Sequence, residues 1–155
     1  MIESWIDNLA KVWEMSDGKF GTVISHRLVG SSDFPASIDP SHLDTAPIAL
    51  TIPAGIRAEY SLGGPRIGFY KGVTEFHVAP DIDKGRLPAL LPWYGRILSA
   101  AAGNMKLSGT VEYFLLDQEE SIVGPIALVY GSEAPHWGFL VNWVVKEHVT
   151  LTVQA

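Results

Sequence analysis

The sequence predicts an α+β fold in which a mainly antiparallel β-sheet packs against two α-helices. Three observations indicate this fold: a helical pattern at the start of the chain, a second one near the middle, and strand-like runs on both sides of the second helix. Helices separated by hairpin-like runs are typical of a sheet that carries its helices on one face. With 155 residues and no internal repeat, residues 1–155 are expected to form one domain.

The first helix is predicted over residues 2–14, where apolar residues recur at helical spacing and charged residues occupy the opposite side. The polar stretch 16–21, with two glycines, is expected to end it. The predicted apolar face consists of Ile2, Trp5, Ile6, Leu9, Val12 and Trp13.

β-Branched and alternating sequence predicts the strands that follow. Between the first two lies 30–47, a polar stretch with three prolines, which is longer than most connections in compact domains. We therefore interpret 30–47 as a loop that faces a partner. The predicted strands cover 22–29, 48–62 with a turn at Pro53–Gly55, 66–80 after a turn at 63–65, 110–116 and 121–131.

The second helix is predicted over residues 92–102, followed by Gly103–Asn104 as a stop signal. Pro88 and Pro92 blur its start, because only one of them can occupy the first turn. The predicted apolar stripe consists of Leu87, Leu90, Leu91, Tyr94, Leu98 and Ala101.

The last strand is predicted within "HWGFLVNWVVKEHVTLTV", residues 136–153. Apolar and mixed residues alternate there over about fifteen positions, well beyond the usual strand length of roughly 5–6 residues. Such a strand either bends around its own sheet or pairs with another subunit. We expect four of its residues to lie in the core or at a subunit interface: Trp137, Phe139, Val141 and Trp143.

Composition excludes several classes of function. The formal charge of −6 disfavours binding to nucleic acid or to an anionic membrane. The absence of cysteine excludes disulfides, thiolate metal sites and thiol nucleophiles. The N-terminus lacks a signal-peptide pattern, and no apolar run is long enough for a membrane helix, so we expect a protein made in a cytoplasm.

Motifs for metal or nucleotide chemistry are weak. Residues 81–85 begin like a calcium loop but lack its later ligands, and Asp39, His42 and Asp44 form a sparse loop cluster. No nucleophile elbow or phosphate-binding glycine loop is present in the sequence. We interpret the adjacent acids at 81–83 and 119–120 as solvated turns, and expect no cofactor, metal or catalytic residue.

The histidines offer the remaining chemistry. His26, His77 and His148 fall within predicted strands, where a half-exposed position is expected. His136 stands at the start of the last strand, where an acid–base role is conceivable although it has no partner nearby in the sequence.

The order of these elements resembles the tail terminator proteins of long-tailed bacteriophages. "IESWIDNLAKVW" is similar to the first helix of that family, and "SSDFPASIDPSHLDTAPIALTI" to its acidic-Phe-Pro segment that leads into a strand. "GVTEFHVAPDIDKGRLPALLPWYGRILSA" resembles its strand, turn and second helix, and "VEYFLLDQEE" with "WGFLVNWVVKEHVT" its closing strands. Residues 30–47 and 121–136 are longer than the resemblance leads us to expect.

The resemblance implies a structural virion protein of the tail or neck, assembled in the host cytoplasm. Such a subunit forms a ring, usually of six copies, that caps the tail tube and joins it to the head–tail connector protein. Its partners would be further copies of itself, the tail tube protein and the connector. Phe34 and Pro35 would make partner contacts. No enzymatic activity is implied.

Two alternatives stay open at this point. One is a small-molecule-binding protein or enzyme that uses His136 and Trp137 in a pocket, with His42 or Asp44. The other is a different ring protein of the phage neck or of head completion.

Overall fold

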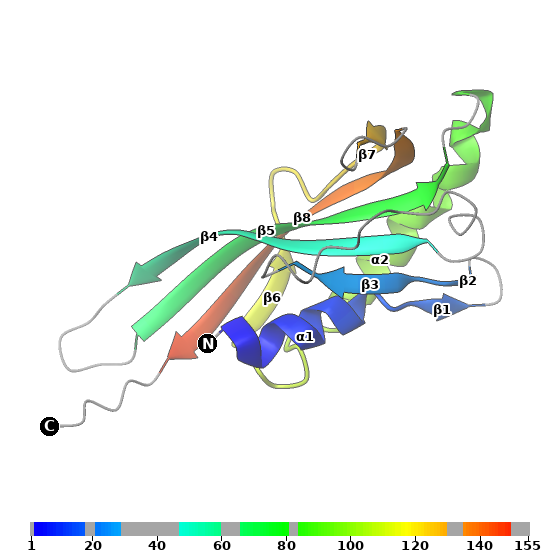
Figure 1. The fold of residues 1–155 in the computed structure, drawn as a ribbon. Coiled ribbons are helices and arrows are strands. Elements are labelled where there is room, and N and C mark those ends of the chain that lie inside the picture. Colours follow the sequence, from blue (N-terminus) through cyan, green and yellow to red (C-terminus); the bar gives the residue numbers. More distant parts are fainter. Residues whose placement is uncertain are drawn as a thin grey trace, which may run out of the picture.

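The computed structural model describes residues 2–17, 21–28, 47–59, 66–80, 84–129 and 135–149. These residues form two α-helices, a 3₁₀ helix and eight strands (Figure 1). The predicted helices and strands occur in the predicted order, and the two-residue strands at 16–17 and 21–22 and the 3₁₀ helix are additional. The elements are α1 (Ile2–Val12), β1 (Ser16–Asp17), β2 (Gly21–Thr22), β3 (Ile24–Arg27), β4 (Ile48–Glu59), β5 (Arg66–Ala79), η3 (Lys84–Leu90), α2 (Pro92–Ala102), β6 (Tyr113–Leu116), β7 (Ile122–Leu128) and β8 (His136–Val149).

Six strands form the main sheet, in the order β3-β4-β5-β8-β6, with β7 also paired to β8. Strand β5 pairs with one edge of β8. Strands β6 and β7 both pair with the other edge of β8, at successive positions along it. Every pair is antiparallel except β3–β4, which is parallel. The predicted α+β class with a mainly antiparallel sheet is confirmed.

Strand β4 corrects one local prediction. The expected turn at Pro53–Gly55 is a β-bulge within a continuous strand of 12 residues. Pro53 pairs with Gly72 and Gly55 with Lys71, so Ala54 is the extra residue on the bulged strand. A bulge tolerates a proline because the ladder is already interrupted there.

Helix α1 buries the face that its sequence predicts. Trp5, Ile6, Leu9 and Trp13 are all fully buried, and the helix ends at Val12, two residues before the predicted end. Trp13 packs edge-on against Phe76, with ring centroids 5.3 Å apart. Burial of these side chains, at roughly 1.5–3 kcal/mol each, holds α1 on the sheet.

Both helices contribute to one hydrophobic core on the same face of the sheet. From α2, Trp93, Ile97 and Ala101 are buried in this core. From β8, Phe139 and Val141 are fully buried in it. At the other end of the sheet, β4, β5 and β8 run on side by side past the helices (Figure 1).

Helix α2 has the predicted bounds, and its predicted apolar stripe faces inward in part: Leu90 and Ala101 are buried, and Leu87 and Tyr94 pack against the core. Leu91 and Leu98 were expected in the core, yet they are 50% and 48% exposed. Trp93 and Ile97 also point inward. The helix is apolar on two sides, so apolar periodicity alone could not decide which of these residues face the sheet.

The final strand matches its predicted alternation. Strand β8 spans 14 residues, and Phe139, Val141, Trp143 and Val145 are all at most 1% exposed. Strands β3, β6 and β7 are shorter than the predicted strands at 22–29, 110–116 and 121–131.

Candidate functional site

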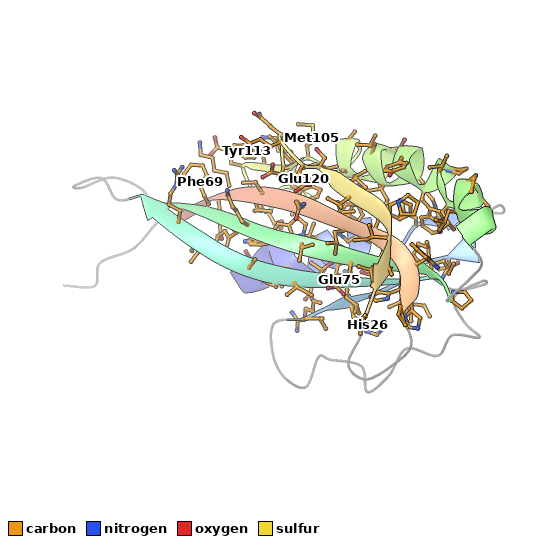
Figure 2. The ribbon with its side chains drawn as sticks, turned by 90° about the horizontal axis from the view of Figure 1, so that it is seen from above. His26, Phe69, Glu75, Met105, Tyr113 and Glu120 are labelled. Carbon is orange, nitrogen blue, oxygen red and sulfur yellow. The ribbon has the colours of Figure 1, made fainter. Side chains whose placement is uncertain are left out.

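The face of the sheet opposite the helices carries exposed charged side chains around two hollows. The register places Glu75 opposite Leu140, one position away from the core pair Phe76 and Phe139. Side chains alternate between faces along a strand, so Glu75 and Leu140 lie on the helix-free face. Figure 2 shows Phe69 and Glu75 on β5, toward opposite ends of this face.

A hollow of about 600 Å³ lies on this face, and we call it the acidic hollow. Carboxylates dominate its charge, with Lys71 as the opposing cation. Its charged lining residues are Lys71, Glu75, Asp117, Glu119 and Glu120.

The turn after β6 organises the acidic side of this hollow. The Asp117 carboxylate accepts hydrogen bonds from the backbone N–H groups of Glu119, at 2.9 Å, and of Glu120, at 3.3 Å. These two bonds, with a smaller contribution from the charge of Lys71, lower the pKa of Asp117. Glu119 and Glu120 themselves are exposed, as the prediction of a solvated turn requires.

A second hollow, of about 630 Å³, lies next to the acidic hollow and shares Lys71 with it; we call it the basic hollow. The Arg57 guanidinium lies 4.6 Å from the centroid of the Phe69 ring. The Lys146 ammonium lies 5.8 Å from Phe69 and 5.7 Å from Tyr113, and pairs with Glu112 at 3.2 Å. Cations above aromatic rings make this end of the face basic and aromatic.

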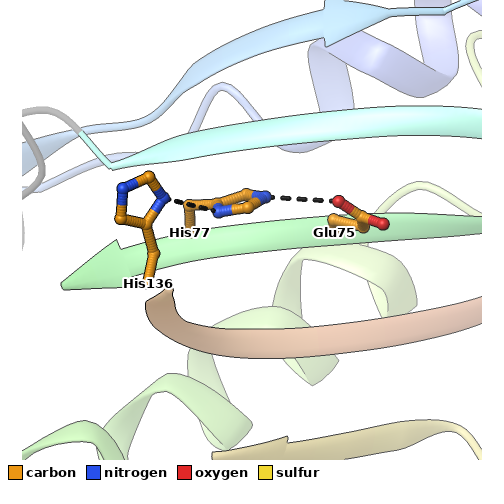
Figure 3. A network of polar contacts seen from close by, with 3 residues as sticks. All are labelled: Glu75, His77 and His136. Atoms are coloured by element: carbon orange, nitrogen blue, oxygen red, sulfur yellow. Dashed lines mark hydrogen bonds and ion pairs between the residues drawn. The ribbon is translucent and has the colours of Figure 1, made fainter. Parts of the chain in front are cut away.

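Beside the acidic hollow, three side chains form a chain of polar contacts that leads into the protein (Figure 3). Oε2 of Glu75 lies 3.2 Å from Nε2 of His77, and Nδ1 of His77 lies 3.2 Å from Nδ1 of His136. Glu75 is 25% exposed, whereas His77 and His136 are 0% and 1% exposed. The chain therefore connects the surface of the hollow with two buried imidazoles.

Hydrogen-bond donors and acceptors dictate the tautomers of the neutral rings. The Glu75 carboxylate can only accept, so Nε2–H of His77 donates to it. Nδ1 of His77 is then an acceptor, and Nδ1–H of His136 donates to it. Such a chain can orient Glu75 at the hollow, and it can pass a proton between the hollow and the interior.

The structure corrects the expectations for these histidines. His77 was expected to be half-exposed, but it is buried. His136 seemed to lack a partner, but its partner is His77, 59 residues away, because β8 pairs with β5. His26 is half-buried on β3, as expected, and the His148 side chain lies outside the described residues.

A buried carboxylate that sequence reasoning missed lies on the helix face of β8. Glu147 is 4% exposed and accepts a hydrogen bond from the Trp5 indole at 3.1 Å. Burial, followed by the charge of Glu147 and its hydrogen bond to the hydroxyl, raises the pKa of Tyr70 to about 12. The sequence did contain a signal for this burial. Glu147 follows Val145 by two residues, and side chains two positions apart on a strand lie on the same face, here the core side.

The remaining predicted positions divide into two groups. Phe139, Val141 and Trp143 are core residues of a single chain, and Trp137 is half-buried against the same core. Phe34, Pro35, Asp39, His42, Asp44 and the turn at 81–83 lie outside the described residues. Within the residues that are described, no three His, Asp or Glu side chains group in a way that could hold a metal ion.

No family model matches the chain, and no curated protein matches it. Among the described helices, none is long and apolar enough to cross a membrane.

Proposed function

We propose that this protein is a structural subunit of a phage tail terminator ring, which caps the tail tube and joins it to the head–tail connector protein. The resemblance of the sequence to that family suggests the role. The observation that carries the proposal is a ribbon of three long strands, β4, β5 and β8, each outer side of which has a stretch that no described strand covers.

The first open edge belongs to β4. Strand β3 pairs with β4 only from Ile48 to Thr51, and beyond that no described strand lies against the outer edge of β4. Residues 54–57 are exposed there, and Ile56 is 61% exposed. Unpaired strand edges are templates for pairing with another chain.

The second open edge belongs to β8. Strand β6 pairs with β8 as far as Lys146, and among the described strands none covers its outer edge from Glu147 to Val149. These two stretches, which no described strand covers, lie at the end of the sheet that runs on past the helices (Figure 1).

The strand directions allow each copy to pair with the next in the same orientation. Strands β4 and β8 are each antiparallel to β5, so they are parallel to each other. If the β8 edge of one copy pairs with the β4 edge of the next, every copy repeats the same contact in the same orientation. A repeated head-to-tail contact of this kind closes into a ring when its rotation allows.

The burial of the His77 and His136 imidazoles is compatible with a mechanical role. A ring subunit works through its surfaces and needs no catalytic residue, and neither His77 nor His136 is exposed to a substrate in this structure. The net charge of −6 would keep a ring lumen from gripping DNA that passes through it. The subunit would act in the virion after assembly in the host cytoplasm.

Native mass spectrometry of the whole chain, with and without tail tube protein, tests the proposal. We expect a ring-sized species, and we expect Ile56→Lys to reduce it because a lysine on a strand edge opposes pairing. Val129→Lys is the matched control, since Val129 is 63% exposed and lies just beyond β7. A wild-type chain that stays monomeric at high concentration, alone and with tube protein, would contradict the proposal.

The second candidate is a small-molecule-binding protein or enzyme, which the contact chain of Glu75, His77 and His136 beside the acidic hollow favours. This candidate requires a ligand that raises the melting temperature of the wild-type chain but not that of His136→Ala. A different ring protein of the neck or of head completion would form a ring that binds connector but not tail tube protein.

A further inference from the structure

An exposed stripe, which we call the α2 stripe, begins at Leu91, the N-cap of α2, continues over the outer face of the helix and ends at Met105, three residues beyond Ala102. Leu91, Leu98 and Met105 are 50%, 48% and 46% exposed, although large apolar residues on a helix usually face a core. Gly95 and Ala102 lie between them and are also exposed. From Leu91 to Ala102 the residues are spaced 4, 3 and 4 positions apart, which is the heptad spacing of helices that pair side by side, and Met105 follows in the turn after the helix.

Large and small residues alternate along the α2 stripe. Gly95 lies between Leu91 and Leu98, and a methyl group added at Gly95 would meet no atom within 4 Å. The glycine is therefore not required by packing inside this chain, and it costs the helix roughly 1 kcal/mol relative to alanine. On the outside, it leaves a gap between two leucines into which another large side chain fits.

The lack of acidic residues on the stripe allows a second copy of this chain to approach there. Two copies with a net charge of −6 each repel one another over most of their surfaces. From Leu87 to Met105, however, the chain has a single charged residue, Arg96. Arg96 lies over the Trp93 ring at 4.5 Å and donates a hydrogen bond to the Met15 carbonyl at 3.1 Å, so it is held on the sheet side.

We propose that two copies of this chain pair through the α2 stripe, with their α2 helices antiparallel across a two-fold axis between Gly95 and Leu98. In this arrangement Leu98 of each copy lies over Gly95 of the other, and Leu91 lies over Ala102. Leu91 and Leu98 each meet a small residue, so this part of the stripe is complementary to itself. Close approach of the two backbones at Gly95 adds van der Waals contact.

The two-fold contact goes beyond the proposed ring. A two-fold contact closes at two copies, whereas the strand-edge contact repeats from copy to copy. The α2 helix lies toward the end of the sheet away from the open ends of β4 and β8 (Figure 1). The two contacts can therefore form at once, which would join two rings or leave a simple dimer where no ring forms.

Substituting Leu98 tests the contact. Leu98→Glu puts an acid at the centre of the stripe, and we expect the dissociation constant of the pair to rise about 30-fold or more. Val129→Glu is the matched control because it adds the same charge at an exposed apolar residue outside the stripe. Sedimentation equilibrium over a roughly hundredfold range of concentration, with native mass spectrometry, measures both variants.

Substituting Gly95 separates pairing from folding. Gly95→Leu replaces glycine by a strong helix former in open space, so we expect the melting temperature of the single chain to rise by a few degrees. It also fills the gap that Leu98 of the other copy needs, so the dissociation constant should rise about tenfold. A change that strengthens the fold while it weakens association cannot be explained by misfolding.

The outcomes distinguish this proposal from the ring. If both hold, Leu98→Glu halves the mass of the assembled species and Ile56→Lys leaves a dimer. If only the α2 contact exists, the wild-type chain is a dimer and Leu98→Glu is a monomer. If Leu98→Glu and Gly95→Leu assemble as the wild-type chain does at every concentration, the α2 contact is overturned whether or not a ring forms.

Discussion

The Trp5 indole donates a hydrogen bond of 3.1 Å to the Glu147 carboxylate, which joins the first helix to the last strand across 142 positions of sequence. Trp5 also contacts two aromatic rings edge-on: Tyr70 at 5.0 Å and Trp143 at 6.0 Å between centroids. A buried carboxylate is stable only when hydrogen bonds satisfy it. This hydrogen bond therefore helps to hold α1 against the C-terminal part of β8.

Glu147→Gln should lower the free energy of unfolding by about 1–3 kcal/mol. The glutamine amide has one acceptor oxygen, so it cannot serve both the Trp5 indole and the Tyr70 hydroxyl as well as a carboxylate does. Urea unfolding measures the change. Glu119→Gln, at an exposed turn, is the control and should change stability by less than about 0.5 kcal/mol. Equal effects of both variants would show that the buried contact contributes nothing.

Tyr70 should ionise late in an alkaline titration. Burial, followed by the charge and hydrogen bond of Glu147, raises its pKa from the ordinary 10.0 to about 12. Because the folded pKa lies above the unfolded one, the stability from this proton is complete below about pH 10 and is lost as the pH rises through about 12. Ultraviolet titration of tyrosinate should show a late component that Tyr70→Phe removes. If all five tyrosines ionise together near pH 10 in the folded chain, the prediction fails.

Gly138→Ala should destabilise the fold by about 3 kcal/mol or more. A Cβ atom at this position would lie 1.7 Å from the Phe76 carbonyl oxygen, so the backbones of β5 and β8 would have to separate. Gly95→Ala is the opposite case, because it adds a methyl group in open space and should stabilise α2. Thermal unfolding of both variants checks the sign: a neutral Gly138→Ala would contradict the close approach of the two strands.

His136→Ala should destabilise the protein by about 1–3 kcal/mol, since it removes the Nδ1 contact to buried His77 and leaves a gap. His26→Ala, at a half-buried position on β3, should cost less than about 0.5 kcal/mol. Urea unfolding again gives the measurement. A harmless His136→Ala would mean that the imidazole contact is not part of the stable structure.

Local sequence patterns were sufficient for several parts of the fold. The apolar face of α1, the bounds of α2 and the buried series Phe139, Val141, Trp143 and Val145 follow from periodicity. Periodicity predicts these correctly because helix and strand geometry repeat every 3.6 and 2 residues, whatever the rest of the chain does. The solvated turn after β6 was predictable for a similar local reason.

The candidate sites depended on contacts between distant residues. The pairing of β5 with β8 brings His77 to His136, and the docking of α1 brings Trp5 to Glu147. Neither contact leaves a local pattern, because register between strands and the docking of a helix are set by packing of the whole core.

By itself, the sequence determined where the two α-helices and the long final strand lie and, for α1 and β8, which side chains face inward. The tertiary structure alone decided how much of the apolar stripe of α2 meets the sheet: Leu90 and Ala101 are buried, whereas Leu91 and Leu98 are exposed. The physical reason is volume: Trp93 and Ile97 fill the space above the sheet, and only one side of a helix can be buried there.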